Sequence, residues 1–248
     1  MTTSSQAFSL PMLYKNNLQL AWDSATTLTV AAGQARDSGN AFDITSSAVT
    51  INAAVNGANG LDTGSLAAST WYAVVQIGSD INTKTPAFML TTFATVATPV
   101  MPLGYNISDV VGYWLTNSSS ELIKGYVVGN GNLRQHYWDD SIKVLNDGTS
   151  ASLANITLTT GVPPIDNTPV LINAEFTPAT ANDYVSFFPG ASSATVGPRI
   201  YGSVATKFNG GQQKILSKLV SSAPTIRYIN SAASCNADVW VNGFEYFV

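Results

Sequence analysis

Short hydrophobic runs separated by small polar residues dominate the chain, and their spacing predicts strands rather than helices. Residues 56–75 read "NGANGLDTGSLAASTWYAVV", so a stretch of Asn, Gly, Asp, Thr, Ser and Ala leads directly into an aromatic and aliphatic run. Successive side chains of a strand point to opposite faces, and in residues 71–77 both faces are largely apolar. We therefore expect this strand to be covered on both sides.

The same alternation of apolar runs and polar turns continues through residues 110–140. Strand-like runs at 110–115, 122–128 and 133–138 are separated by a polar turn and by the Gly-Asn-Gly-Asn sequence at 129–132, which is typical of a tight hairpin. These runs predict a three-stranded β-meander. No long stretch has apolar residues at the i, i+3, i+4, i+7 spacing of an amphipathic helix.

A second series of strand-like runs follows, with Pro, Gly, Asn or Ser in nearly every gap. They lie at 142–145, 156–160, 170–176, 184–188, 200–206, 214–220, 225–230 and 238–247. Short strands at this roughly regular spacing are typical of a two-sheet sandwich of the jelly-roll type. The composition changes from aromatic-rich to small and polar near residues 140–150.

The predicted fold is all-β, with two β-sandwich-like domains preceded by an extended N-terminal arm. We place the arm at residues 1–20, a β domain with the meander at 21–140, and a jelly-roll-like sandwich at 141–248. The arm has apolar residues around a proline and no evident strand partner, so we expect it to be held by a neighbouring subunit or by its own chain. The predicted assembly contacts are Phe8, Leu10, Leu13 and Tyr14.

Composition narrows the classes of partner. Hydrophobic residues make up 45% of the chain and charged residues only 10%, against about 25% charged in a typical globular domain. A surface of Ser, Thr, Asn and Gly suits a protein whose faces are partly covered in an assembly. The net charge is −4 and no basic cluster occurs, which excludes nucleic acid as the main partner because phosphate binding needs such a cluster.

The single cysteine, Cys235, excludes an intrachain disulfide and a cysteine zinc site, and it fits folding in a reducing cytoplasm. The N-terminal residues lack the basic and long apolar regions of a secretory signal. No run approaches the roughly 18 apolar residues that a spanning helix needs. We expect no membrane insertion.

Candidate catalytic groups are few. His136 is the only histidine, so a Ser-His-Asp relay would have to use it, yet no G-x-S-x-G motif accompanies it. Asp139 and Asp140 are adjacent and would point to opposite faces of a strand, although the sequence leaves open an acidic pair formed in space. We expect no catalytic residues, no cofactor and no metal site.

The aromatic residues of the predicted meander, which have polar neighbours, favour a second kind of site; they are Trp114, Tyr126, Tyr137 and Trp138. Alternation places Arg134, His136 and Trp138 on one face, which we expect to point outward. Exposed aromatic rings beside hydrogen-bonding groups can stack on sugar rings, so these three residues form a predicted glycan-contact face. The alternative is that the aromatic residues belong to a sandwich core or to subunit contacts.

Five stretches together resemble a module of tailed-bacteriophage virion proteins. They are "LTVAAGQARDSGNAFDI" at 28–44, "NGANGLDTGSLAASTWYAVVQIGS" at 56–79, "MPLGYNISDVVGYWLTNSSS" at 101–120, "FTPATANDYVSFFPGASSATVGP" at 176–198 and "INSAASCNADVWVNGFEYF" at 229–247. The resemblance implies a virion surface component, such as a tail fibre, a tail-associated protein or a head appendage, and it implies no defined enzyme. The chain lacks the repetitive shaft of large fibres, which favours a short appendage or adaptor.

Three functions follow as expectations. The first is a non-enzymatic structural component of a virion, assembled in the bacterial host cytoplasm, homotrimeric, and joined to other virion proteins through its N-terminal arm; a capsid decoration protein or head fibre is its variant. The second is a carbohydrate-binding module that recognises a host-surface glycan. The third is a depolymerase, which would require two close carboxylates in a cleft.

Overall fold

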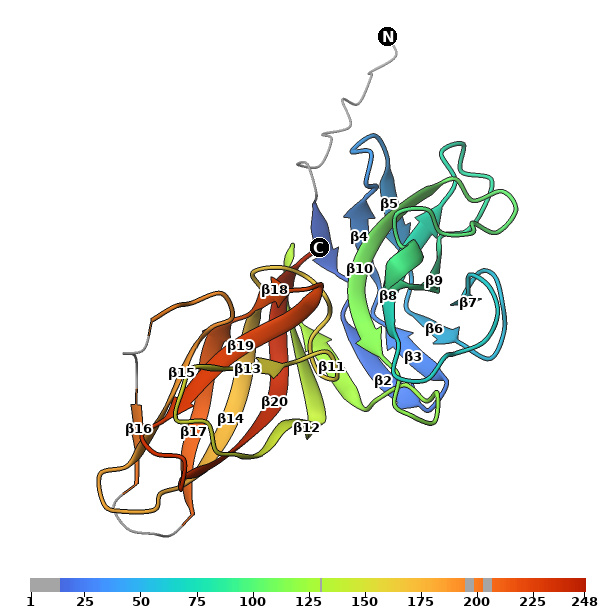
Figure 1. Ribbon diagram of the computed structural model, residues 1–248. Helices are drawn as coiled ribbons and strands as arrows, with labels where there is room; N and C mark the ends of the chain where they lie inside the picture. Colours follow the sequence, from blue (N-terminus) through green and yellow to red (C-terminus); the bar gives the residue numbers. More distant parts are fainter. Residues whose placement is uncertain (1–13, 130, 195–198, 203–206) are drawn as a thin grey trace. The chain divides into compact units, whose positions relative to one another are not determined.

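Most strands form where the sequence alternates or runs apolar, and many turns between them form at small polar segments. Figure 1 shows how the strands are arranged. The computed structural model describes residues 14–129, 131–194, 199–202 and 207–248. Within these ranges there is no α-helix, and the one helical segment is the short 3-10 turn η1 (Phe93–Thr95). The prediction of an all-β chain is confirmed.

The chain divides into two units. Unit 1 contains residues 1–123, 127–134 and 247–248, and unit 2 contains residues 124–126 and 135–246. The chain therefore changes unit more than once between residues 123 and 135.

Unit 1 contains three groups of paired strands. β1 (Lys15–Asn17), β4 (Gly33–Arg36) and β5 (Asp43–Ser46) form an antiparallel sheet in the order β1-β4-β5. β2 (Leu20–Ser24), β3 (Thr27–Val30) and β6 (Val49–Asn52) are neighbours in that order. β10 (Ile107–Leu115), β8 (Trp71–Gly78), β9 (Ala87–Thr92) and β7 (Gly60–Leu61) form a sheet in the order β10-β8-β9-β7, in which only β7 and β9 are parallel.

β8 is the centre of unit 1, and every residue in it is buried. One face packs in a cluster with side chains of β9, including Met89. On the opposite face, Gln76 Nε2 donates to the Ile44 carbonyl of β5 at 3.2 Å and contacts Ser46 Oγ at 3.0 Å. The expectation that this strand is covered on both sides is confirmed.

Unit 2 is built from two antiparallel sheets with a sandwich-like organisation. One has the order β17-β14-β20-β12, with bounds β17 (Phe208–Leu216), β14 (Pro169–Thr177), β20 (Asn236–Phe247) and β12 (Leu133–Gly148), and β11 (Gly125–Val128) is the next neighbour of β12. The other has the order β13-β19-β15-β16, with bounds β13 (Ala154–Thr157), β19 (Ala223–Asn230), β15 (Tyr184–Pro189) and β16 (Arg199–Tyr201), and β18 (Lys218–Val220) also pairs with β19. The jelly-roll topology remains a prediction.

A bulge in β20 decides which of its side chains face outward. Leu171 of β14 pairs with Gly243, whereas Ile172 pairs with Val241, so Asn242 is an extra residue on β20. Val239 and Val241 before the bulge and Phe244 and Tyr246 after it are buried in the core of unit 2. Consequently Trp240 and Glu245 share the outer face, although they are an odd number of residues apart.

Two features of the predicted organisation differ from the structure. The predicted boundary after residue 140 lies inside β12, because the polar residues there are the exposed half of a long strand rather than a linker. The predicted meander does not form, since β10 pairs with β8 while β11 and β12 lie in another sheet.

The predicted arm also differs over its described part. Lys15–Asn17 pair with β4 as strand β1, and Leu18 and Leu20 are fully buried in unit 1. The apolar side chains after residue 14 therefore belong to the core of this chain.

Candidate binding face

Five side chains of unit 2 gather into the surface that we call the tyrosine face: Tyr126, Gln135, Tyr137, Lys214 and Glu245. They come from β11, β12, β17 and β20. Alternation along β12 places its even-numbered residues at 134–138 inside and Gln135 and Tyr137 on the other side. The bulge in β20 brings Glu245 to the same side.

The two tyrosine rings are stacked. Their centroids lie 5.4 Å apart with an interplanar angle of 23°, and Tyr126 is 44% exposed. Rings that contact each other on one side and reach solvent on another form a flat amphipathic platform. Such a platform can accept the apolar face of a ring-shaped ligand.

A chain of polar contacts borders the platform. Tyr137 Oη donates to Gln135 Oε1 at 3.2 Å, and Gln135 Nε2 donates to Glu245 Oε1 at 2.8 Å. Lys214 Nζ donates to Glu245 Oε2 at 2.5 Å. Burial raises the pKa of the Glu245 carboxyl, but the hydrogen bonds from Lys214 and Gln135 outweigh it and leave the pKa lowered. Glu245 is therefore an ionised acceptor fixed beside the two rings.

A second polar cluster surrounds Trp240 on the same sheet. Lys143 Nζ and Lys207 Nζ lie 5.0 Å and 6.0 Å from the centre of the indole ring system. Lys207 also contacts Glu175 at 2.5 Å and Asp238 at 3.2 Å, and Lys143 contacts Asp238 at 3.1 Å. These contacts make the cluster a network of ion pairs.

Asp238 and Glu175 of this cluster lie directly opposite each other on β20 and β14, so they are close carboxylates. Burial raises the pKa of Asp238, but the Asp147 N–H and the two lysines outweigh it and leave the pKa lowered. A general acid for glycoside cleavage needs a raised pKa. The ionised state of Asp238 therefore favours an ion-pair role over an acid role.

The predicted glycan-contact residues lie on the opposite side of β12 from the tyrosine face. Arg134 and His136 are fully buried and Trp138 is 5% exposed, so the expected outward orientation is wrong. The His136 ring lies 4.0 Å from that of Trp138 and 4.9 Å from that of Phe244, between centroids. This aromatic packing makes the histidine part of the core of unit 2.

Arg134 is held by backbone carbonyls of unit 1. Its Nη1 donates to the Asn17 carbonyl at 2.6 Å and to the Gly129 carbonyl at 3.2 Å. Alternation correctly grouped residues 134, 136 and 138 but could not say which face was inside. Tyr126 and Tyr137 were among the aromatic residues considered for sugar stacking, but they were not placed on the predicted face. Gln135, an intervening position of the same strand, was missed.

The predicted assembly contacts are only partly described. Phe8, Leu10 and Leu13 lie outside the described residues. Tyr14 is half-buried, and its carbonyl accepts a hydrogen bond from the Arg36 N–H at 2.8 Å. The assembly role of these residues stays a prediction.

Within the described ranges, no group of three or more His, Cys, Asp and Glu side chains is placed to hold a metal ion. In the same ranges, no helix is long and apolar enough to cross a membrane. No family model, no curated protein and no solved structure matches this chain.

Proposed function

We propose that this chain is a non-enzymatic structural component of a tailed-phage virion, a short tail fibre, tail-associated protein or appendage, and that its tyrosine face contacts a host-surface glycan. The virion assignment is supported by the sequence resemblance and by the weakly charged, Ser-, Thr- and Asn-rich composition. The observation that carries the binding role is the stacked Tyr126–Tyr137 pair beside the fixed carboxylate of Glu245.

Sugar chemistry fits this surface in two ways. One face of a pyranose ring carries C–H groups, which pack against an aromatic ring, while its hydroxyls need hydrogen-bond partners. The carboxylate of Glu245 and the ammonium of Lys214 supply an acceptor and a donor at the edge of the platform. Ligand sites combine aromatic area with a few placed polar groups in this way.

The binding test is Tyr137→Ala and Tyr126→Ala, with Tyr201→Ala as the matched control, because Tyr201 is a 51% exposed tyrosine elsewhere on unit 2. We expect each face variant to weaken binding to its best host-surface glycan by about two- to tenfold, since an aromatic contact is worth roughly 0.5–1.5 kcal/mol. The control should bind like the parent. The measurement is a glycan array followed by titration calorimetry.

No glycan bound by the parent protein, or equal loss in the Tyr201→Ala control, would contradict the binding role. The virion role is tested separately, by light scattering of the purified chain and by locating it in purified particles. A trimer incorporated into particles is expected, and copy number per particle then separates a tail component from capsid decoration. A monomer that never joins particles would overturn the virion assignment.

A further inference from the structure

A lysine and an aspartate meet inside unit 1, where neither takes part in the tyrosine face. Lys15 Nζ lies 2.6 Å from Asp109 Oδ2, and their side chains are 0% and 7% exposed. Lys15 belongs to β1 and Asp109 to β10, which are strands of different sheets. We propose that these two side chains join covalently, through an isopeptide bond between Lys15 Nζ and the side-chain carbonyl carbon of Asp109.

The backbone fixes both ends of this contact. Lys15 pairs with Ala35 in β4, which pairs with Ile44 in β5, and all three side chains are buried. Asp109 pairs with Gln76 in β8, whose side chain donates to the Ile44 carbonyl. The sheet that carries Lys15 therefore accepts a hydrogen bond from Gln76, the residue paired with Asp109. Holding two reactants in this way raises their effective concentration far above any attainable in solution.

The surroundings favour a neutral carboxyl group. Burial raises the pKa of Asp109, which outweighs the opposing effects of Lys15 and of the Val110 N–H, and the negative charge of Asp37 raises it further. Tyr113, whose own pKa is raised to about 12 by burial and by Asp109, stays a neutral phenol. An amine condenses with a carboxylic acid only when both are uncharged, and the raised pKa of Asp109 favours the uncharged form of that partner.

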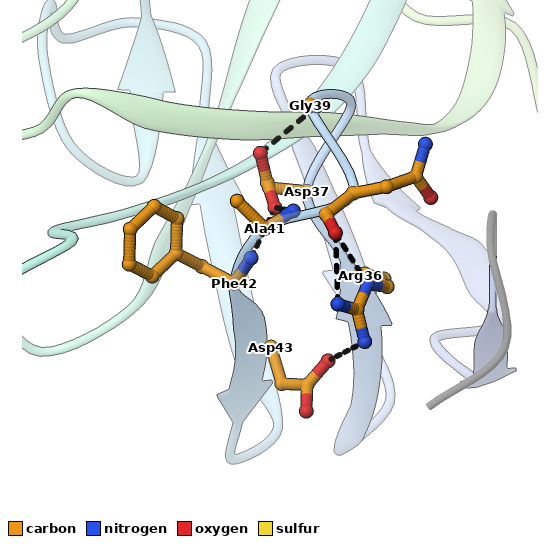
Figure 2. Close-up of polar contacts among 7 residues, drawn as sticks. Arg36, Asp37, Gly39, Ala41, Phe42 and Asp43 are labelled. Atoms are coloured by element: carbon orange, nitrogen blue, oxygen red, sulfur yellow. Dashed lines mark hydrogen bonds and ion pairs between the residues drawn. The ribbon is translucent and has the colours of Figure 1, made fainter. Parts of the chain in front are cut away.

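Asp37 is held in place by its own loop between β4 and β5. Its Oδ1 accepts hydrogen bonds from the N–H groups of Ala41 at 2.8 Å and Phe42 at 2.5 Å, and its Oδ2 accepts one from Gly39 at 2.9 Å (Figure 2). Arg36 closes the loop by donating to the Asn40 carbonyl. Three backbone N–H donors therefore hold the Asp37 carboxyl group in a fixed position within this loop.

The reaction needs no outside reagent. The Lys15 ammonium transfers a proton to the Asp109 carboxylate, and the resulting amine attacks the carboxyl carbon to give a tetrahedral intermediate. The Val110 N–H, which donates to the Asp109 carboxyl group, stabilises charge that develops on its oxygen. Collapse of the intermediate breaks the C–O bond and releases one water molecule, leaving a neutral amide between β1 and β10. Exclusion of solvent from the site favours the condensed product.

Such a bond would fasten the first described strand to a strand of another sheet. β1 has only three residues, and its pairing with β4 alone gives little resistance to a load applied at the N-terminal side. The chain has one cysteine and hence no intrachain disulfide. The lysine–aspartate link would supply the covalent closure that a disulfide supplies elsewhere.

The test is mass spectrometry of the purified full-length chain, first intact and denatured, then after digestion with trypsin. We expect an intact mass lower than the sequence mass by one water, no cleavage after Lys15, and one branched peptide that contains both Lys15 and Asp109. Lys15→Met and Asp109→Ala should each restore the full mass. Lys143→Met, which removes a lysine paired with Asp238 on the outer face of unit 2, is the matched control and should keep the water loss.

The loss of one water does not by itself identify an isopeptide bond, because a cyclic imide at an aspartate, for example at Asp147-Gly148, gives the same mass change. An imide is cleaved by hydroxylamine and would persist in the Lys15→Met variant, whereas the isopeptide bond resists hydroxylamine and would disappear. Separate, unbranched Lys15 and Asp109 peptides from folded parent protein would overturn the proposal. This peptide analysis uses the parent chain, so its result does not depend on whether a variant folds.

Discussion

The two units place the same kind of lysine–carboxyl contact in environments that differ at the lysine. In unit 1, the side chains of Lys15 and Asp109 are 0% and 7% exposed, whereas in unit 2 the side chains of Lys214 and Glu245 are 52% and 9% exposed. Removing two charges from water costs several kcal/mol per ion, and a partner has to offset that cost. A surface pair incurs little of it and contributes little.

The pKa values of the carboxyl groups follow this contrast. Burial raises the pKa of Asp109 despite its lysine, while hydrogen bonds leave the pKa of Glu245 lowered. Asp183 of unit 2 is lowered to about 2, chiefly by the Ser231 hydroxyl and the Thr180 N–H, against a smaller opposing effect of burial. The chemical identity of a pair therefore does not fix the direction of the pKa shift of its carboxyl group. The balance between burial and hydrogen bonding decides whether the pKa is raised or lowered.

The largest expected effect comes from leaving the buried lysine without its carboxylate. Asp109→Ala leaves the buried lysine without a counter-ion, so it should be about 3–5 kcal/mol less stable to unfolding than the double variant Lys15→Met with Asp109→Leu, which has neither charge. Both variants lack the proposed covalent link, so the comparison isolates the effect of the uncompensated charge. Urea denaturation of the two variants measures this difference, and a value below about 1 kcal/mol would contradict the burial argument.

A second expected effect concerns how stability depends on pH. We expect the dependence due to Asp109 in unit 1 to be opposite to that due to the carboxyl groups of unit 2. Lys15→Met removes the cation that opposes the rise in the pKa of Asp109, so this pKa moves further above the value of about 3.9 in an unfolded chain. The contribution of Asp109 to stability is then fully present below about pH 4 and is lost as the pH rises through the folded pKa. Lys15→Met should gain stability on acidification from about pH 7 to pH 5, relative to Lys15→Met with Asp109→Leu.

Thermal denaturation across this pH range gives the comparison directly. Equal pH profiles for the single and the double variant would show that Asp109 titrates normally. The carboxyl groups of unit 2 set the opposite expectation, since a lowered pKa contributes stability that is present above the unfolded pKa and is lost on acidification.

The smallest expected effect is that of the surface pair. Glu245→Gln keeps the shape of the side chain and removes the charge that faces Lys214, so the free energy of unfolding should change by less than about 1 kcal/mol. The same change should weaken glycan binding measurably, because it replaces one of the two acceptor oxygens with an amide donor and removes the negative charge from the tyrosine face. This variant would then lose glycan binding while keeping its free energy of unfolding. A loss of stability as large as that expected for Asp109→Ala would contradict the difference proposed between the two lysine–carboxyl pairs.

Sequence patterns located most strands because a strand needs only local information. The strand at 71–77 was expected to be buried on both faces, and β8 is. The runs at 170–176 and 184–188 match β14 and β15 within a residue or two. Alternation and turn residues are properties of a few adjacent positions, so they can be read directly from the chain.

Pairing between distant strands and the choice of the inner face could not be read in this way. β10 pairs with β8, although β9 separates them in sequence and β11 is the next strand after β10. Alternation grouped residues 134, 136 and 138, but their inward orientation depends on packing partners such as Phe244, far along the chain. Lys15 and Asp109 likewise come into contact only because two sheets bring β1 and β10 together, and no local sequence motif predicts this contact.

The extra residue of β20 has a consequence for how this chain can tolerate insertions and deletions. Upstream of Asn242 the odd-numbered residues face the core, and downstream the even-numbered ones do. Loss of the Asn242 codon would only remove the bulge, because Val241, Phe244 and Tyr246 would then follow regular alternation and stay on the inner face. Loss of one codon elsewhere in β20 would turn the core residues on one side of the deletion toward solvent. In a lineage of such genes, one-codon deletions in the last strand should therefore occur at the bulge, and other length changes in multiples of two codons.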